Sequence, residues 1–191
     1  MLVSEISRAK LFGKLNSIGY RGIESATTFC KLRGNPYVEI VHWLHQILQL
    51  QDSDLHRIIK HFALDPSRLA KDFTESLDRL PRGASSITDL SSQVDEAVER
   101  GWVYATLLLG ESQVRTGHLI LGMVKTKNLR NALTAISREF EKVKEEPLSD
   151  KFAEITSGSP ESSLSSTDGS GGGAAPGEAS GAMAPATMGK G

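Results

Sequence analysis

The sequence predicts an all-α protein built from two similar helical units, with an added helix before them and a disordered tail after them. Apolar residues recur at helical spacing, the sequence matches itself when residue 42 is aligned with residue 118, and the composition changes near residue 157. Residues 1–156 are expected to form one domain of packed helices. The expected parts are the added helix at 3–18, repeat one at 22–80, repeat two at 88–155 and a flexible Gly/Ala/Ser/Pro linker at 157–191.

The first element is an amphipathic stretch that precedes the two units and has no counterpart in the duplication. Leu11, Leu15 and Ile18 are spaced i, i+4 and i+7, so they would share one face of a helix, whereas Ile6 and Phe12 lie off that line. The helix would therefore present apolar surface in two directions, unless all of these side chains belong to the core. Charged residues interrupt the apolar ones, which argues against both a signal peptide and a membrane span.

The helices inside the two units are predicted from apolar stripes and from start and stop signals. Asp65 before Pro66 is a typical N-cap with proline at the first helical position, and Thr88 can cap the first helix of repeat two. Pro81 and Gly83 break the chain between the units. The stripes are Leu55, Ile58, Ile59 and Phe62; Leu69, Phe73, Leu77 and Leu80; and Leu90, Val94, Ala97, Val98, Ala105 and Leu108.

The duplication rests on a shared pattern more than on the number of identical residues. Each unit has a helix, a glycine break, a short loop and then an apolar helix that starts near a histidine. A two-residue gap later brings Leu55 and Ile59 onto Leu129 and Leu133, which keeps the apolar pattern in register. The identical pairs are Leu32/Leu108, Gly34/Gly110, Val38/Val114 and His42/His118.

Composition limits the kinds of partner and compartment. The chain has 22 Lys and Arg against 23 Asp and Glu, and these charges are interspersed, so neither nucleic acid nor an anionic membrane is an expected partner. Cys30 is the only cysteine, which excludes a disulfide framework and fits a reducing compartment; we expect a buried, inert thiol. The tail holds half of the 18 glycines and no aromatic residue, so it cannot bury enough apolar surface to fold. The protein is expected to be soluble and cytoplasmic.

Two histidines are candidate metal ligands. His42 and His45 could share a helix face at i, i+3, as metal ligands do. The repeat argues against this, because His118 matches His42 whereas Leu121 matches His45. The recurrent histidine is therefore predicted to be a structural residue near a helix start, and no metal site is expected.

No catalytic site is predicted either. Asp95, Glu96 and Glu99 lie on one expected helix beside Arg100, where a solvent-exposed face is the ordinary explanation of such charges. No segment fits the phosphate-binding pattern G-x-x-x-x-G-K-[ST], so this chain cannot by itself be a P-loop ATPase.

The two His-led helices resemble those in the N-terminal domain of the Clp/Hsp100 unfoldases. Within that group, the ClpV family of type VI secretion ATPases is the most similar, and the resemblance covers about residues 4–155. The stretches that carry it are KLFGKLN at 10–16, RGNPYVE at 33–39, HWL at 42–44 and HLIL at 118–121.

The resemblance implies a recognition domain that binds an N-terminal helix of the large contractile-sheath subunit in a hydrophobic groove, so that the ATPase can disassemble the sheath. The added first helix would help to form this groove, and apolar side chains of the guest helix would fill it. Phe12 and Leu15, with Ile87, Leu90 and Val94 at the start of repeat two, are the candidate walls, chosen by amphipathicity. Each of them could equally be a core residue.

The resemblance also implies that this chain is not an enzyme and needs no cofactor, since ATP and Mg would bind ATPase modules that are absent from it. The fragment would be monomeric and the parent protein hexameric. The alternative is a substrate- or adaptor-docking domain of another Clp/Hsp100 chaperone, which need not have the added helix. An independent enzyme would hydrolyse ATP by itself, and a nucleic-acid-binding bundle would show steeply salt-dependent binding.

Overall fold

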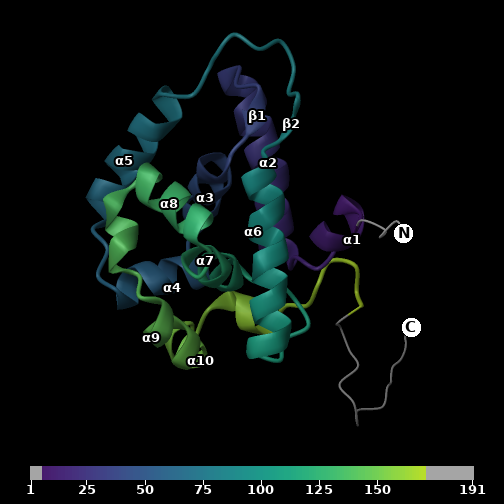
Figure 1. The fold of residues 1–191 in the computed structure, drawn as a ribbon, viewed down its shortest axis with the longest axis vertical. Helices are drawn as coiled ribbons and strands as arrows, with labels where there is room; N and C mark the ends of the chain where they lie inside the picture. The colour runs from purple at the N-terminus through teal and green to yellow at the C-terminus, as the bar shows by residue number, and fades with distance from the viewer. Residues whose placement is uncertain (1–5, 171–191) are drawn as a thin grey trace.

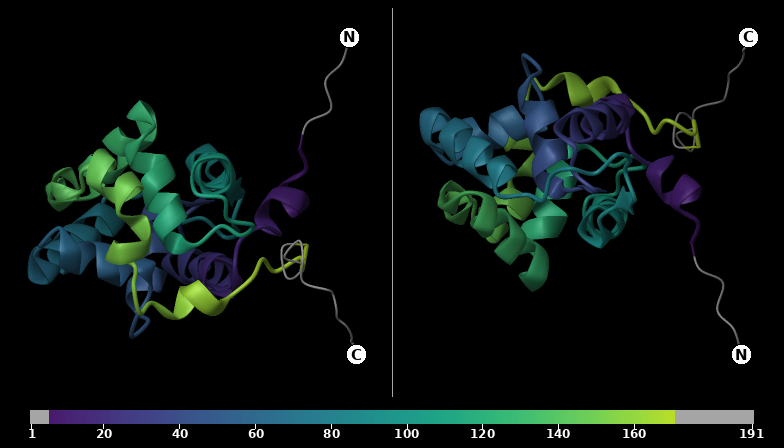
Figure 2. Two further views of the ribbon diagram at one scale, coloured as in Figure 1. Left: turned by 90° about the horizontal axis from the view of Figure 1, so that it is seen from below. Right: turned by 90° about the horizontal axis from the view of Figure 1, so that it is seen from above.

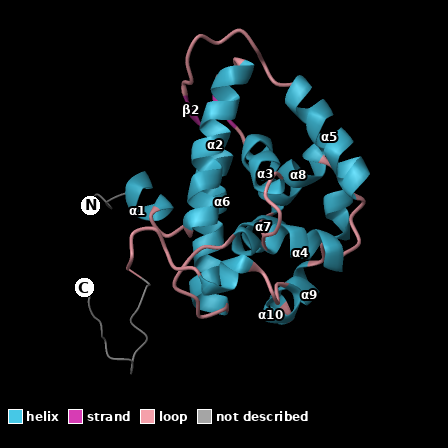
Figure 3. Ribbon diagram, turned by 180° about the vertical axis from the view of Figure 1, so that it is seen from behind, coloured by secondary structure: helices cyan, strands magenta, loops and turns pink. Residues whose placement is uncertain are grey.

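The computed structural model describes residues 6–170, and their structure is mostly helical, which confirms the predicted class (Figures 1 and 3). The helix α1 (Arg8–Phe12) comes first. Repeat one holds α2 (Ser17–Arg33), α3 (Ile40–Leu48), α4 (Asp54–His61) and α5 (Pro66–Asp78). Repeat two holds α6 (Ser92–Val103), a π-helical turn (Tyr104–Leu108), α7 (Thr116–Val124) and α8 (Lys127–Ile136). The short elements that follow are a 3-10 turn (Arg138–Lys142), α9 (Glu145–Asp150), α10 (Phe152–Ile155) and a second 3-10 turn (Pro160–Ser163).

The break between the first long helix and the next helix is alike in the two units, as the sequence match predicted. Gly34 and Gly110 both have positive φ, at 70° and 67°, where a side chain would be strained. The third residue of α3 is His42 and that of α7 is His118, and both rings turn back to the helix start. Nδ1 of His42 accepts the N–H of Glu39 at 2.8 Å, and Nδ1 of His118 accepts the N–H of Arg115 at 2.9 Å. The prediction of a structural histidine at a helix start is confirmed.

The helix-start signals were correct for α5 and wrong for α6. The carboxylate of Asp65 accepts the N–H groups of Ser67 and Arg68, which is the predicted N-cap. Thr88 caps no helix, because α6 begins only at Ser92 and its N-cap position is Ser91. The N–H of Thr88 donates to the carbonyl of Pro36 at 2.7 Å. The residues after it form β2 (Asp89–Leu90), which pairs in parallel with β1 (Tyr37–Val38) and delays the start of α6.

The added helix is much shorter than the predicted 3–18, of which residues 3–5 lie outside the described residues. α1 ends at Phe12, Leu15 forms a parallel β-bridge with Val114, and the side chain of Asn16 caps α2. Leu11 and Leu15 therefore do not share a helix face, and Ile18 belongs to α2. The reason is local: Asn16 is a strong N-cap residue, so it starts a new helix.

The tail was expected to be disordered from residue 157, and this boundary was wrong. Residues 157–170 follow a defined path from α10 beside the start of α2 to the end of α1 (Figure 2). Glu161 in this segment is completely buried, and Ser166 forms an antiparallel bridge with Asn16. Polar contacts rather than apolar burial hold the segment, which is why composition did not predict its order. The remainder of the expected linker, 171–191, lies outside the described residues.

Helix α7 runs through the centre of the domain, and each of its nine residues is buried. It packs closely on α6, where Gly122 faces Gly101. A Cβ atom placed on Gly122 would lie 2.7 Å from the backbone N of Gly101 and 2.8 Å from the carbonyl carbon of Arg100. The two helix backbones therefore meet without a side chain between them.

Replacing Gly122 with alanine is expected to lower the free energy of unfolding by about 1–3 kcal/mol, because only a shift of a helix can relieve a clash with backbone. Gly19→Ala is the matched control. The atom nearest to its added Cβ is the end of the Leu15 side chain at 3.2 Å, which can move, so its cost should stay below about 1 kcal/mol. Urea unfolding measures both variants, and equal stabilities would contradict the close α6–α7 contact.

Candidate partner-binding site

Helix α1 stands at one side of the bundle, next to α2 and α6 (Figure 1), and a hollow lies on each side of it. The hollow between α1 and α2, here the α1–α2 groove, has a volume of about 540 Å³, and the α1–α6 hollow has about 590 Å³. The α1–α2 groove is lined by Arg8, Ala9, Phe12, Tyr20, Ile23, Glu24 and Thr27. The α1–α6 hollow is lined by Ile6, Arg8, Leu11, Ser92, Asp95, Glu96 and Glu99.

The α1–α2 groove has the character of a site for an apolar helix face. Phe12 and Ile23 form its floor and are 6% and 8% exposed, while the ring of Tyr20 stands at its rim and is 38% exposed. Apolar floors with an aromatic residue at the edge are typical of grooves that bind amphipathic helices. The α1–α6 hollow is bordered by three carboxylates instead, so it fits an apolar ridge less well.

Arg8 fixes the orientation of α1 between these two hollows. Its guanidinium binds both carboxylate oxygens of Asp95 in α6, at 2.8 and 2.6 Å, and its third nitrogen binds Asp89 in β2 at 2.8 Å. The hydrogen bonds to Asp95 and Asp89 raise the pKa of Arg8, and the bond from Arg8 lowers the pKa of Asp89. All three side chains are partly exposed, so the pairs mainly determine geometry and contribute little stability.

The five residues that the sequence predicted as groove walls lie in three different environments in the structure. Phe12 lines the α1–α2 groove. Ile87 and Leu90 are partly buried against the core, on either side of the Asp89 that holds Arg8. Leu15 and Val94 are completely buried, so we place them in the core rather than in a groove wall. Periodicity shows that a residue is apolar on one face, but it cannot show whether that face is covered.

Of the seven residues that line the α1–α2 groove, only Phe12 was predicted from the sequence; the apolar and aromatic ones that were missed are Ala9, Tyr20 and Ile23. Tyr20 and Ile23 lie three residues apart near the start of α2. Tyr20 falls between the expected added helix at 3–18 and repeat one at 22–80, and neither residue belongs to a predicted apolar stripe. Asp95 and Glu96 were expected on a solvent-exposed face, and they are half-buried beside α1. The signal available in the sequence was an aromatic residue directly after the unduplicated helix.

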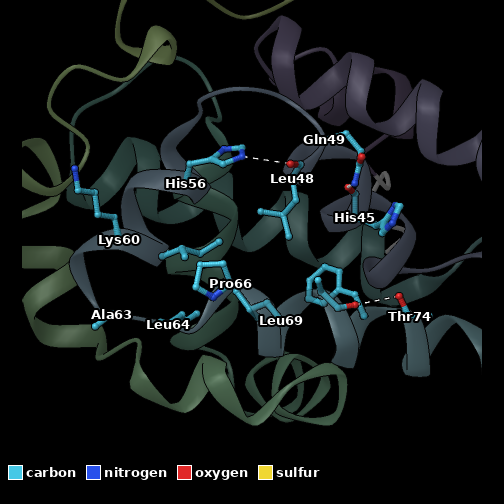
Figure 4. Close-up of a pocket in the computed structure, with 13 residues that line it drawn as sticks. His45, Leu48, Gln49, His56, Lys60, Ala63, Leu64, Pro66, Leu69 and Thr74 are labelled. Carbon is cyan, nitrogen blue, oxygen red and sulfur yellow. Dashed lines mark hydrogen bonds between the residues drawn. The ribbon is translucent and has the colours of Figure 1, made fainter.

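A separate cavity of about 570 Å³ lies within repeat one, between α3, α4 and α5 (Figure 4). Leu48, Leu64, Leu69 and other apolar side chains line most of it. His45 and His56 lie at its edge. His45 stacks on Phe29 with ring centroids 4.8 Å apart, and Nδ1 of His56 lies 2.7 Å from the Ser53 hydroxyl. None of the five predicted residues lines this cavity.

Metal ligation and thiol chemistry depend on how the titratable side chains within residues 6–170 are grouped. No group of three His, Cys, Asp or Glu side chains in this range is placed to hold a metal ion. Cys30 is buried, as predicted, and its Sγ contacts the carbonyl oxygens of Asn35 and Tyr37; burial raises the pKa of its thiol. Over the same range, no helix has both the length and the apolar character needed to cross a bilayer.

The two helix-start histidines predict how stability depends on pH. Burial, as the largest cause, and then the charge of Arg33 lower the pKa of His42 to about 4. For His118, burial and then the charge of Arg115 lower the pKa to about 3. Since an unfolded histidine titrates near pH 6.5, the unfolded state takes up protons first as the pH falls. This contribution to stability is complete above pH 6.5 and is lost toward pH 4, by up to about 1.4 kcal/mol per pH unit for each histidine.

Chemical unfolding at pH 7 and pH 5 tests this expectation in the wild type and in His42→Asn. Burial and the charge of Asp54 raise the pKa of Glu161, so its contribution to stability increases as the pH falls. This contribution is the same in the wild type and in the variant, so it cancels in the comparison. The variant should lose less stability than the wild type between the two pH values. Equal losses would contradict the assignment to His42.

The sequence matches one protein family and a curated relative. The family model described as the Clp repeat (R) N-terminal domain matches residues 20–136. The AAA+ ATPase ClpV1 of Pseudomonas aeruginosa is 66% identical over 188 residues, which are 98% of this chain and 21% of that protein. The chain therefore spans about a fifth of the length of this curated relative.

Two solved structures are similar as well. One comes from a study of the ATPase ClpV, the TssB-TssC sheath and the accessory HsiE protein; it is 67% identical, covers 83% of this chain and 98% of its own, and has a TM-score of 0.81. The other is a complex of a ClpV N-domain with a VipB peptide, at 23% identity and a TM-score of 0.70, covering 82% of this chain and 96% of its own. At that identity the second likeness shows the fold alone.

Proposed function

The chain belongs to the Clp repeat N-terminal domain family, and we propose that it is the recognition domain of a type VI secretion ATPase of the ClpV kind. The family match confirms the resemblance that the sequence predicted. The domain binds a helix from the N-terminus of the large contractile-sheath subunit and presents it to ATPase modules, which disassemble the sheath. ATP and Mg bind those modules, and the domain itself performs no catalysis. The parent protein is hexameric and cytoplasmic.

The observation that carries the proposal is the apolar groove that α1 forms with α2. A ClpV N-domain has been solved with a VipB peptide, so a domain of this fold can hold a peptide of that kind. In this chain, Phe12 and Ile23 offer an apolar floor, and Tyr20 offers a partly exposed ring. A guest helix would place side chains at i, i+3, i+4 and i+7 along this floor. Ile87 and Leu90 would flank one end of the groove, near Asp89.

The proposal is tested by titrating the 191-residue chain with a helical peptide from the N-terminus of the large sheath subunit. A scrambled peptide of the same composition is the control. The sheath peptide should bind at least about tenfold more tightly, a difference of about 1.4 kcal/mol. An unfolded model substrate is added as a third ligand. Equal binding of sheath and scrambled peptides would refute the proposal, and preference for the unfolded substrate would favour a general docking domain.

A further inference from the structure

Residues 157–170, here called the strap, hold the chain segment that connects α1 to α2. The N–H of Asp168 donates to the carbonyl of Gly13 at 2.9 Å, and the N–H of Thr167 donates to the carbonyl of Leu15 at 2.8 Å. The hydroxyl of Thr167 donates to Gly13 as well, at 3.0 Å. Lys14 forms an ion pair with Asp168 at 3.2 Å. The strap therefore contacts the residues immediately after the last turn of α1.

Glu161 anchors the strap to both repeats. Its completely buried carboxylate accepts the N–H of Asp54 and the N–H of Thr116, each at 2.7 Å. These two residues are the first of α4 and α7, where unpaired N–H groups and the helix dipole favour a negative charge. The same carboxylate accepts the side-chain amide of Asn16 at 2.9 Å, next to the strap's contacts with Leu15.

Helix α1 depends on such contacts because it is too short to be stable alone. It has five residues, whereas isolated helices need roughly 12–15 residues to be even marginally stable in water. Its contacts with the rest of the domain include the ion pairs of Arg8 at its start, the packing of Leu11 and Phe12 in its last turn and the hydrogen bonds of the strap just beyond it. The position of α1, and so the width of the α1–α2 groove, follows from these three attachments.

We propose that the strap is a positioning element of the α1–α2 groove, and that docking of the strap and binding of the guest helix strengthen each other. This inference rests on the proposed function. Coupling of two binding equilibria is reciprocal. If docking of the strap raises the affinity for the peptide by a given factor, binding of the peptide raises the equilibrium constant for strap docking by the same factor. Releasing the strap therefore weakens peptide binding. Thr167 and Asp168 are the residues that transmit the effect, through their hydrogen bonds to Leu15 and Gly13.

The test compares two proline substitutions in the strap of the full chain. Thr167→Pro removes the N–H that donates to Leu15. Ser165→Pro is the matched control, because Leu164 before it already has the extended conformation, φ −92° and ψ 167°, that a following proline requires. Ser165 makes none of the strap's hydrogen bonds to residues 13–16 that hold α1.

Peptide affinity and amide hydrogen exchange are both measured, well below the melting temperature. Thr167→Pro is expected to weaken peptide binding about tenfold, within the usual range of coupling energies, and to speed exchange in α1 but not in α7. Ser165→Pro should leave both unchanged. In the wild type, saturating peptide should slow exchange of the Thr167 and Asp168 amides.

Unchanged α1 exchange in Thr167→Pro, or unchanged strap exchange when peptide binds, would overturn the inference. Faster exchange in α1 and α7 together would overturn it too, since that marks a general loss of stability. If the wild type binds no sheath peptide, the proposed function fails, whereas the α1 exchange in the two variants still decides whether the strap positions α1.

Discussion

Replacing Arg115 with alanine is expected to lower the free energy of unfolding by about 3–5 kcal/mol, because it leaves buried carboxylates without their counter-charge. The guanidinium binds both oxygens of Asp54 at 2.8 Å, and the two side chains are 7% and 0% exposed. The buried carboxylate of Glu161 lies close enough to Asp54 for that charge to raise its pKa. Without Arg115, two neighbouring carboxylates would remain in the interior. Urea unfolding at pH 7 measures the loss.

The matched control is Arg68→Ala, which removes an exposed arginine from its pair with the half-buried Asp72. Arg68 is 60% exposed and its Nε lies 3.2 Å from the carboxylate, so the cost should be below about 1 kcal/mol. A double variant, Arg115→Met with Asp54→Asn, should recover part of the stability, because it removes both charges together. If Arg115→Ala costs no more than Arg68→Ala, the buried network does not hold the two repeats together.

Replacing Tyr20 with aspartate is expected to weaken binding of the sheath peptide at least about 30-fold, or about 2 kcal/mol. The change removes the aromatic ring at the rim of the α1–α2 groove and places a carboxylate beside Phe12 and Ile23, where an apolar guest side chain would have to desolvate it. Because Tyr20 is partly exposed, the fold should be retained. Calorimetric titration measures the affinity, and a thermal melt checks the fold.

Leu32→Asp serves as the control on the same helix. Leu32 is 81% exposed near the other end of α2, so it receives the same charge outside the groove. Its peptide affinity should equal that of the wild type. Wild-type affinity in Tyr20→Asp would show that the peptide binds elsewhere, for instance in the cavity between α3, α4 and α5, and an equal loss in both variants would indicate damage to α2.

Local patterns were sufficient for the helical class and for the internal repeat. Both rest on interactions between residues that are only a few positions apart, and such interactions can be predicted from the sequence alone. Examples are the apolar stripes, the N-cap at Asp65 and the glycines at 34 and 110. The paired histidines His42 and His118 belong to the same group, since each ring bonds to the helix start three residues before it. These features were predicted and confirmed.

Only the tertiary structure decided which apolar residues are covered and where the chain becomes ordered. Leu15 and Val94 have the spacing expected of groove residues, but residues distant in sequence bury them completely. The strap has the composition of a disordered tail, yet Glu161 finds its partners at Asp54 and Thr116, 107 and 45 residues away. A sequence pattern records the period of a helix, whereas burial and the pairing of buried charges depend on contacts between distant segments.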